Sequence, residues 1–151
     1  MLPRSMMAVR LFGYGDPSVL RYVEAPMPDI GPDEVLVRVS ATSVTRWDLR
    51  YRQGLLTPPP GRAPLPLPFQ LGREAAGVVE AAGAQVRDFR PGDRVVAMTC
   101  PACGQCEYCR RGLDNLCVDI GLPGHQRFGG YAQYVCRKGS ELLHAPDSVS
   151  F

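Results

Sequence analysis

Short apolar runs recur along the chain, and each is bounded by glycine, proline or aspartate. In EVLVRVSA the apolar residues from Val35 to Val39 alternate with a charge at Arg38. The runs AAGVVEAAG (75–83) and DRVVAM (93–98) are rich in alanine and valine, and GYAQYVCRKG (130–139) alternates again. Alternation with a period of two and enrichment in β-branched residues predict strands in these four stretches.

One segment has a helical spacing of apolar residues. In VTRWDLRYRQG, residues 44–54, the side chains of Val44, Trp47 and Tyr51 share one face of a predicted helix, and Gly54 is suited to end it. The following stretch TPPPGRAPLPLP, residues 57–68, predicts an extended proline-rich loop. The last residues, PDSVSF, are typical of a helix entrance with Ser150 as N-cap, so we expect the chain to be cut from a longer one.

Composition supports many short strands. The 151 residues include 16 glycines and 15 prolines, a density that favours turns over long helices. Hydrophobic residues make up 45% and charged residues 21%, which is ordinary for one soluble globular domain. The net charge of +2 is too small to indicate nucleic acid or an anionic membrane as a partner.

The chain also lacks the marks of a membrane or secreted protein. No apolar run approaches the length of a membrane span, and the N-terminal stretch MLPRSMMAVRLFGYG has no signal-peptide apolar region. We therefore expect a cytoplasmic protein, whose thiols stay reduced. Closely spaced cysteines in that compartment favour a metal site over disulfides.

Five of the six cysteines lie in CPACGQCEYCRRGLDNLC, residues 100–117. A bacterial ferredoxin-type cluster is excluded, because its fourth ligand position falls on Arg110 or on Leu113. A zinc ribbon needs a second, separated C-x₂-C pair, which is absent here. A thioredoxin-like motif needs only one pair and a βαβ context. A tetrahedral zinc takes four ligands, so one of the five cysteines is left over.

The spacing Cys103-x₂-Cys106-x₂-Cys109-x₇-Cys117, with Gly112 and Asn115 near its end, resembles the structural-zinc lobe of the medium-chain dehydrogenase/reductase superfamily. The resemblance implies one structural zinc on these four cysteines, because four sulfurs leave no open coordination position. Cys100 is then expected to be a small residue at the entrance of the lobe, with an exchange for Cys103 as the alternative. Cys136, in a predicted strand, is expected to be a packed thiol.

The rest of the chain resembles the same superfamily. Residues 7–44 are similar to its opening hairpin and second strand. The stretch LGREAAGVVEAAGAQV matches its G-H-E-x₂-G-x₅-G signature at Gly72, Glu74, Gly77 and Gly83. The resemblance covers essentially all of residues 1–151. It implies a mainly β fold, the GroES-like irregular β-barrel of a zinc-type alcohol dehydrogenase-like or quinone oxidoreductase-like protein. Few short helices and a zinc-binding lobe at about 98–125 are expected to accompany the barrel.

The sequence departs from the catalytic-zinc pattern of that superfamily. The ligand cysteine is replaced by Thr45, the ligand histidine by Arg73, and the proton-relay hydroxyl by Trp47. Threonine is a poor zinc ligand and a guanidinium cannot coordinate a cation, so we expect no catalytic zinc. The closer similarity is then to the zinc-independent quinone and enone reductases.

By analogy with those enzymes, we expect Thr45 and Asp48 at the edge of the substrate cleft as the catalytic candidates. Arg46 is the candidate for a contact with the pyrophosphate of NAD(P). Glu74 is expected to pair with Arg73 or Arg46. His125, just past the lobe, is expected to be a surface loop residue.

The chain has no G-x-G-x-x-G fingerprint, so a Rossmann domain for NAD(P) is not encoded in it. The preferred hypothesis is the substrate domain of an NAD(P)-dependent oxidoreductase that acts on a small carbonyl, enone or quinone. The alternative is a free-standing zinc-stabilised β module with a binding role or no catalytic role. The expected partner is a small-molecule substrate, and a homodimer is left open.

Overall fold

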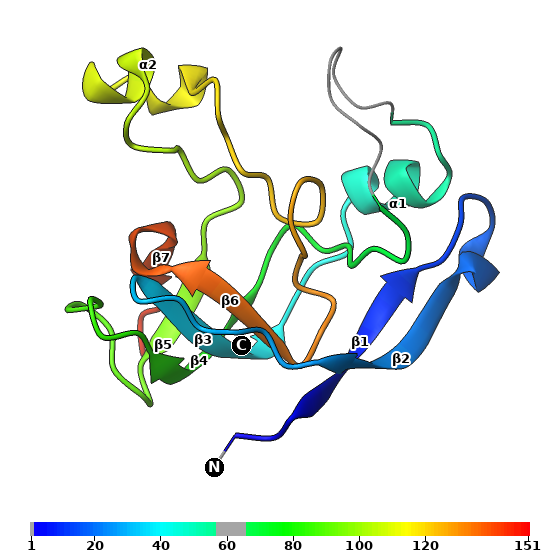
Figure 1. The fold of residues 1–151 in the computed structure, drawn as a ribbon, viewed down its shortest axis with the longest axis horizontal. Helices are drawn as coiled ribbons and strands as arrows, with labels where there is room; N and C mark the ends of the chain where they lie inside the picture. The colour runs from blue at the N-terminus through cyan, green and yellow to red at the C-terminus, as the bar shows by residue number, and fades with distance from the viewer. Residues whose placement is uncertain (1, 57–65) are drawn as a thin grey trace.

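The computed structural model describes residues 2–56 and 66–151. Most of the predicted proline-rich loop, at 57–65, lies outside the described residues. The mainly β architecture is confirmed (Figure 1). A two-stranded sheet pairs β1 (Ser5–Leu11) with β2 (Leu20–Pro26), and a five-stranded sheet has the order β6-β3-β4-β5-β7. Its strands are β3 (Glu34–Ala41), β4 (Ala76–Ala82), β5 (Arg94–Ala97), β6 (Tyr134–Lys138) and β7 (Leu142–His144), and every pair in both sheets is antiparallel.

The four strand predictions are confirmed, since they coincide with β3, β4, β5 and β6. The opening hairpin implied by the family resemblance is β1 and β2. The three-residue strand β7 was not predicted. Such a short run has too few positions to show alternation, and its place beside β5 is set by the rest of the sheet.

The helical elements are short. They are the α-helices α1 (Arg46–Arg52) and α2 (Glu107–Arg110), and the 3₁₀ turns η1 (Pro17–Val19), η2 (Asp114–Leu116) and η3 (Gly139–Glu141). Helix α1 lies inside the segment predicted to be helical. Of the three residues predicted to share one face, Val44 lies before the helix and is 72% exposed, Trp47 is 49% exposed, and Tyr51 is buried.

Two apolar clusters hold the body of the domain. In the five-stranded sheet, valines of four strands pack together: Val35, Val37, Val79, Val95 and Val135. The second cluster joins the N-terminal hairpin to α1 through Leu11, Tyr51, Phe69 and Leu71. Leu11 and Phe69 also exchange backbone hydrogen bonds of 2.7 and 2.9 Å. These contacts fix the hairpin and α1 against the chain that leads into β4.

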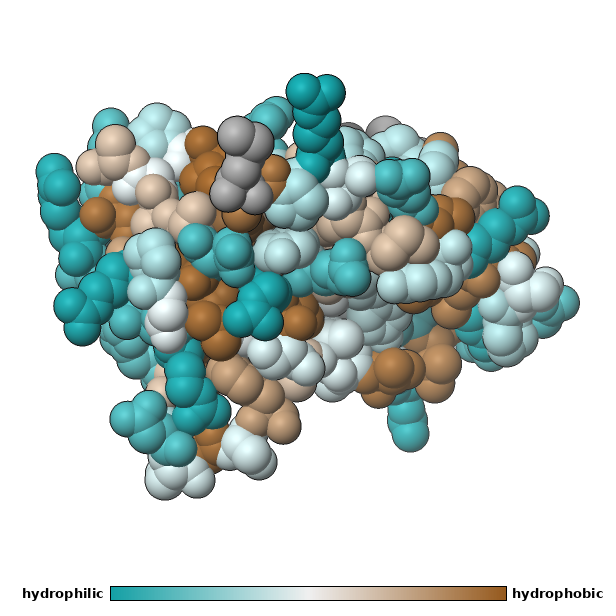
Figure 2. Space-filling view, turned by 90° about the horizontal axis from the view of Figure 1, so that it is seen from below, coloured by the Kyte–Doolittle hydropathy of each residue, from teal (hydrophilic) through white to brown (hydrophobic). Residues whose placement is uncertain are grey.

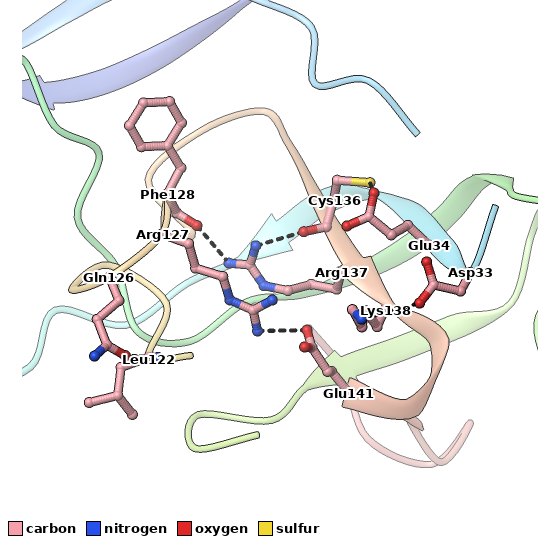
Figure 3. A network of polar contacts seen from close by, with 10 residues as sticks. All are labelled: Asp33, Glu34, Leu122, Gln126, Arg127, Phe128, Cys136, Arg137, Lys138 and Glu141. Atoms are coloured by element: carbon pink, nitrogen blue, oxygen red, sulfur yellow. Dashed lines mark hydrogen bonds and ion pairs between the residues drawn. The ribbon is translucent and has the colours of Figure 1, made fainter. Parts of the chain in front are cut away.

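A buried arginine network supports β6 (Figure 3). Arg137 is 4% exposed, and its guanidinium donates to the carbonyl oxygens of Cys136 at 2.7 Å and Phe128 at 3.1 Å. Beside it, Arg127 forms an ion pair with Glu141 at 2.6 Å. Burial and the neighbouring Arg127 lower the pKa of Arg137 to about 10. The network joins the 127–128 segment, β6 and η3 into one unit.

The cysteine-rich segment stands apart from both sheets. Figure 1 shows α2 and η2 at one end of the molecule, linked to the body by two irregular stretches. On the face seen in Figure 2, apolar residues reach the surface in several places between polar ones. In the described part of the chain, no helix has the length and apolar character needed to cross a membrane.

Candidate metal centre and substrate cleft

The four cysteines with metal-ligand spacing converge in the lobe. The Sγ atoms of Cys103, Cys106, Cys109 and Cys117 all lie within 4.8 Å of one another. The distance is 3.9 Å from Cys103 to Cys109 and 3.4 Å from Cys106 to Cys109. Tetrahedral zinc with Zn–S bonds of about 2.3 Å requires sulfurs about 3.8 Å apart. The donor set therefore fits a closed four-sulfur zinc site.

Backbone amides turn the sulfurs toward one another. The N–H of Cys106 donates to Cys103 Sγ at 3.4 Å, and the N–H of Cys109 donates to Cys106 Sγ at 3.5 Å. The N–H of Cys103 donates to Cys117 Sγ at 3.3 Å. Donation from the amides of Cys109 and Val118 lowers the pKa of Cys106 to about 6. The thiolate, which is the form that binds metal, is thus favoured at Cys106, whereas desolvation and the hydrogen bond with Cys106 raise the pKa of Cys109.

Cys100 lies outside this cluster and is exposed. Its sulfur accepts a hydrogen bond from Nη2 of Arg73 at 3.0 Å, and the same nitrogen reaches the carbonyl oxygen of Thr99 at 3.4 Å. The guanidinium carbon of Arg73 is 5.3 Å from the centre of the Trp47 ring. Cys100 therefore contacts Arg73 and takes no part in the four-sulfur cluster.

The start of α1 is held by a reciprocal capping box. Thr45 is the N-cap, and its hydroxyl donates to Asp48 Oδ2 at 2.6 Å. The Asp48 carboxylate also accepts the N–H of Thr45 at 2.8 Å and the N–H of Gly72 at 3.0 Å. Asp48 is 4% exposed, so these donors compensate a buried charge. Both catalytic candidates thus take part in fixing α1 to the glycine of the G-x-E signature.

Glycine is required at that point of contact. Gly72 has a φ of +99°, and a Cβ there would lie 2.6 Å from Tyr131 Cδ1 and 2.8 Å from the backbone nitrogen of Gly130. A second signature glycine, Gly77, would bring a Cβ to 2.0 Å from the carbonyl oxygen of Arg38 on the paired strand. Close packing therefore requires both signature glycines, and this packing places Arg73 and Glu74 beside α1.

One expectation about neighbouring side chains is wrong, and another is correct only in part, since His125 lies in a turn but contacts Tyr51. Glu74 forms no ion pair with Arg73 or Arg46; its carboxylate accepts a hydrogen bond of 2.5 Å from the Ser43 hydroxyl instead. His125 is not a free surface loop residue. It is half-buried, its ring meets the Tyr51 ring edge-on at 4.6 Å, and its Nδ1 contacts the Tyr51 hydroxyl. Burial raises the pKa of Tyr51 above its ordinary value, and the charge of Arg73 opposes that shift.

A cleft of about 400 Å³ opens next to these residues. Its walls include Thr42, Ser43, Glu74, Val96 and Thr99. Glu74 and Thr99 are the chain neighbours of Arg73 and Cys100, so the cleft adjoins the Arg73–Cys100 contact. Arg46 is exposed at the first position of α1. The structure thus brings Thr45, Asp48, Arg73 and Cys100 into one region. The spacing of residues in the sequence did not predict that Cys100 lies there.

Residues 31–147 match the alcohol dehydrogenase GroES-like domain family. The chain belongs to this family. Over 128 residues it is 38% identical to sorbitol dehydrogenase of Bacillus subtilis (strain 168), an alignment that covers 83% of this chain and 35% of the relative. Over 151 residues it is 34% identical to alcohol dehydrogenase of Schizosaccharomyces pombe, covering 98% of this chain and 41% of the relative.

Solved alcohol dehydrogenases have the same fold as this GroES-like domain. A crystal structure of an NAD-dependent alcohol dehydrogenase superimposes with a TM-score of 0.89 at 40% identity, over 97% of this chain and 41% of that one. A cobalt- and zinc-bound thermostable alcohol dehydrogenase from Pyrobaculum aerophilum gives a TM-score of 0.81 at 33% identity, over 93% and 41%. The GroES-like domain thus spans 35–41% of the length of these relatives.

Proposed function

We propose that this GroES-like domain is the substrate domain of an NAD(P)-dependent oxidoreductase that holds one structural zinc and no catalytic zinc. The observation that supports it most directly is the contrast between two sets of residues. Four cysteines form a closed sulfur cluster, whereas threonine and arginine stand at the positions of the family's catalytic ligands. Four-sulfur sites are structural, since they leave no position open for substrate.

The residues at the catalytic positions have other partners. The Thr45 hydroxyl is used in the capping box with Asp48, and the Arg73 guanidinium contacts Thr99 and Cys100. Among the described residues, the lobe cysteines are the one group of three or more His, Cys, Asp or Glu side chains close enough to share a metal. The stretch TPPPGRAPL, which lies outside the described residues, contains none of these residue types. This domain therefore offers no second donor set of its own.

In this proposal the zinc fixes the lobe, and it supplies no chemistry to the substrate. Cys103, Cys106, Cys109 and Cys117 hold it. The substrate, a small carbonyl compound, enone or quinone, enters the cleft beside Glu74 and Thr99. Asp48 acts as a positioning residue, because its carboxylate accepts hydrogen bonds from Thr45 and Gly72. Thr45 remains the catalytic candidate at the cleft edge.

NAD(P)H supplies the hydride when it is bound. Arg46 is the residue of this chain suited to contact its pyrophosphate, because the side chain is exposed and forms no ion pair with any described acidic residue. One charge-assisted hydrogen bond contributes about 1.5–3 kcal/mol, whereas millimolar affinity needs about 4 kcal/mol. Binding therefore requires a further domain of the kind that carries a glycine-rich phosphate loop.

The test is calorimetric titration of NADPH into two proteins. One is residues 1–151, and the other is the chain extended by whatever the same gene encodes after Phe151. We expect no measurable binding to the first protein, and micromolar binding with reductase activity in the second. Micromolar binding by residues 1–151 alone, or an extended protein that neither binds NADPH nor reduces a carbonyl compound, enone or quinone, contradicts the proposal. The second result favours the zinc-stabilised β module, which the missing glycine-rich fingerprint also supports.

A further inference from the structure

Arg73 is fixed both next to its backbone and at its guanidinium. It follows Gly72, whose amide is bonded to Asp48 of α1. It lies over the ring of Trp47 on the same helix, at 5.3 Å. Its Nη2 reaches Thr99 and Cys100, where the chain enters the cysteine-rich lobe. An arginine whose guanidinium contacts two other segments is preorganised to receive a ligand, because it loses little side-chain freedom on binding.

The charge of Arg73 has no counter-ion within the chain. No ion pair includes it, and its Nε is buried without a hydrogen-bond partner in the described structure. The two parts of the chain outside that structure, Met1 and TPPPGRAPL, contain no aspartate or glutamate. Every aspartate and glutamate of the chain therefore lies in the described structure. Glu74 is adjacent in sequence, but its carboxylate accepts the Ser43 hydroxyl instead of pairing with Arg73.

We propose that Arg73 is the oxyanion-binding residue of the cleft, which rests on the proposed function. Of the substrates named there, a guanidinium suits an enone best. Bound NAD(P)H would supply a hydride to the β-carbon of the substrate, and the π electrons would move onto the carbonyl oxygen. Arg73 stabilises the resulting enolate oxygen by charge-assisted hydrogen bonds. Transfer of a proton from water to the α-carbon would then restore the C=O bond and leave hydroxide.

The chemistry of the guanidinium selects that substrate class. A zinc ion stabilises the concentrated charge of an alkoxide as a Lewis acid. An arginine donates hydrogen bonds from a planar, delocalised cation and keeps its proton. It matches an enolate, whose charge is shared between oxygen and carbon. The substrate oxygen is expected to sit beside Trp47 and Cys100, next to the cleft walls at Glu74 and Thr99.

The chain contains its own probe for this site, because Trp47 is its one tryptophan. Zinc-loaded, ¹⁵N-labelled residues 1–151 are titrated with sodium acetate, a carboxylate oxyanion, against sodium chloride at equal ionic strength. We expect a saturable shift of the Trp47 indole N–H resonance with acetate and a smaller, linear drift with chloride. Arg73→Gln should lose the saturable shift. Arg73→Lys should keep it with at least threefold weaker affinity, and Arg87→Gln, a matched exposed control, should keep it unchanged.

An equal acetate response in Arg73→Gln and in the original chain overturns the inference, as does identical drift with acetate and chloride. Arg73→Lys keeps the test valid where Arg73→Gln does not fold. In the extended protein, Arg73→Gln should lower kcat for enone reduction by about a hundredfold, the usual cost of losing an oxyanion donor. The two proposals fail separately. NADPH binding without the acetate response rejects only the role of Arg73, and the acetate response without NADPH binding rejects only the oxidoreductase assignment.

Discussion

The backbone amide of Gly72 donates a hydrogen bond of 3.0 Å to Asp48 Oδ1, across a separation of 24 residues. This bond joins the first turn of α1 to the glycine that opens the G-x-E signature. The other carboxylate oxygen caps the helix through Thr45. One buried carboxylate thus fixes the first turn of α1 relative to Gly72, and Arg73 follows Gly72 directly in the chain.

Asp48→Asn is expected to destabilise the domain. The amide group presents an N–H₂ to donors that need an acceptor, and hydrogen bonds to charged groups contribute about 1.5–3 kcal/mol each. Urea unfolding of zinc-loaded protein should show a loss of about that size. Asp29→Asn, at an exposed position, should stay within about 0.5 kcal/mol of the original chain. Equal stability of the two variants would show that the Asp48 contacts contribute nothing.

The cysteines divide into two groups. Replacing Cys103, Cys106, Cys109 or Cys117 by serine should remove the zinc, because a hydroxyl cannot replace a thiolate in the cluster. Cys100→Ser and Cys136→Ser should keep one zinc per chain, since neither sulfur belongs to the cluster. Elemental analysis of the six purified variants decides this. Retention of zinc in Cys103→Ser together with its loss in Cys100→Ser would exchange the roles of these two residues.

Chelation of the zinc should loosen the lobe and leave the sheet intact. The lobe contains only short helical turns, and its backbone turns are organised around the sulfurs. The strands β3 and β4 have their own valine core. Hydrogen exchange after chelation should therefore rise across residues 98–120, while residues 35–39 and 76–80 stay protected. Loss of protection in all of these segments would mean that the lobe and the sheet unfold together.

Cys136 should make the stability of the domain depend on pH in the alkaline range. Burial and the nearby Glu34 carboxylate raise the pKa of this thiol from 9.0 to about 12. Above pH 9 the unfolded chain loses this proton while the folded chain keeps it, so the contribution to stability is complete below pH 9 and is lost as pH rises toward 12. Against Cys136→Ala and Cys136→Ser, the advantage of the original chain in zinc-saturated urea unfolding should shrink from pH 8 to 10.5. A constant difference across that range would exclude the effect.

Local patterns in the sequence were enough to locate strands β3 to β6 and a cysteine-rich metal site, and the family resemblance selected its four ligands. Strands β3 to β6 appear as alternating or valine-rich runs, because burial of one or both faces dictates which residues they contain. The spacing of the lobe cysteines places the four sulfurs together, since each short turn brings two of them inward. Both features depend on residues close together in the chain, so they can be predicted without a structure.

The contacts around the cleft were not predictable in this way. Arg73 and Cys100 are 27 residues apart, and Tyr51 and His125 are 74 apart. Their meeting depends on how α1, the Gly72 turn and the lobe entrance pack. The helical face was also misjudged, because α1 buries Asp48 beside Tyr51 and leaves Val44 and Trp47 exposed. Capping and a tertiary hydrogen bond outweigh the apolar spacing there.

Zinc content under saturating conditions tests most directly whether the domain has a structural site and lacks a catalytic one. Zinc-loaded residues 1–151, and the extended chain, are dialysed against micromolar free zinc and examined by elemental analysis and X-ray absorption. We predict one zinc per chain with four sulfur neighbours at about 2.3 Å. A second zinc with nitrogen or oxygen neighbours, lost on substitution of Thr45, would contradict the account.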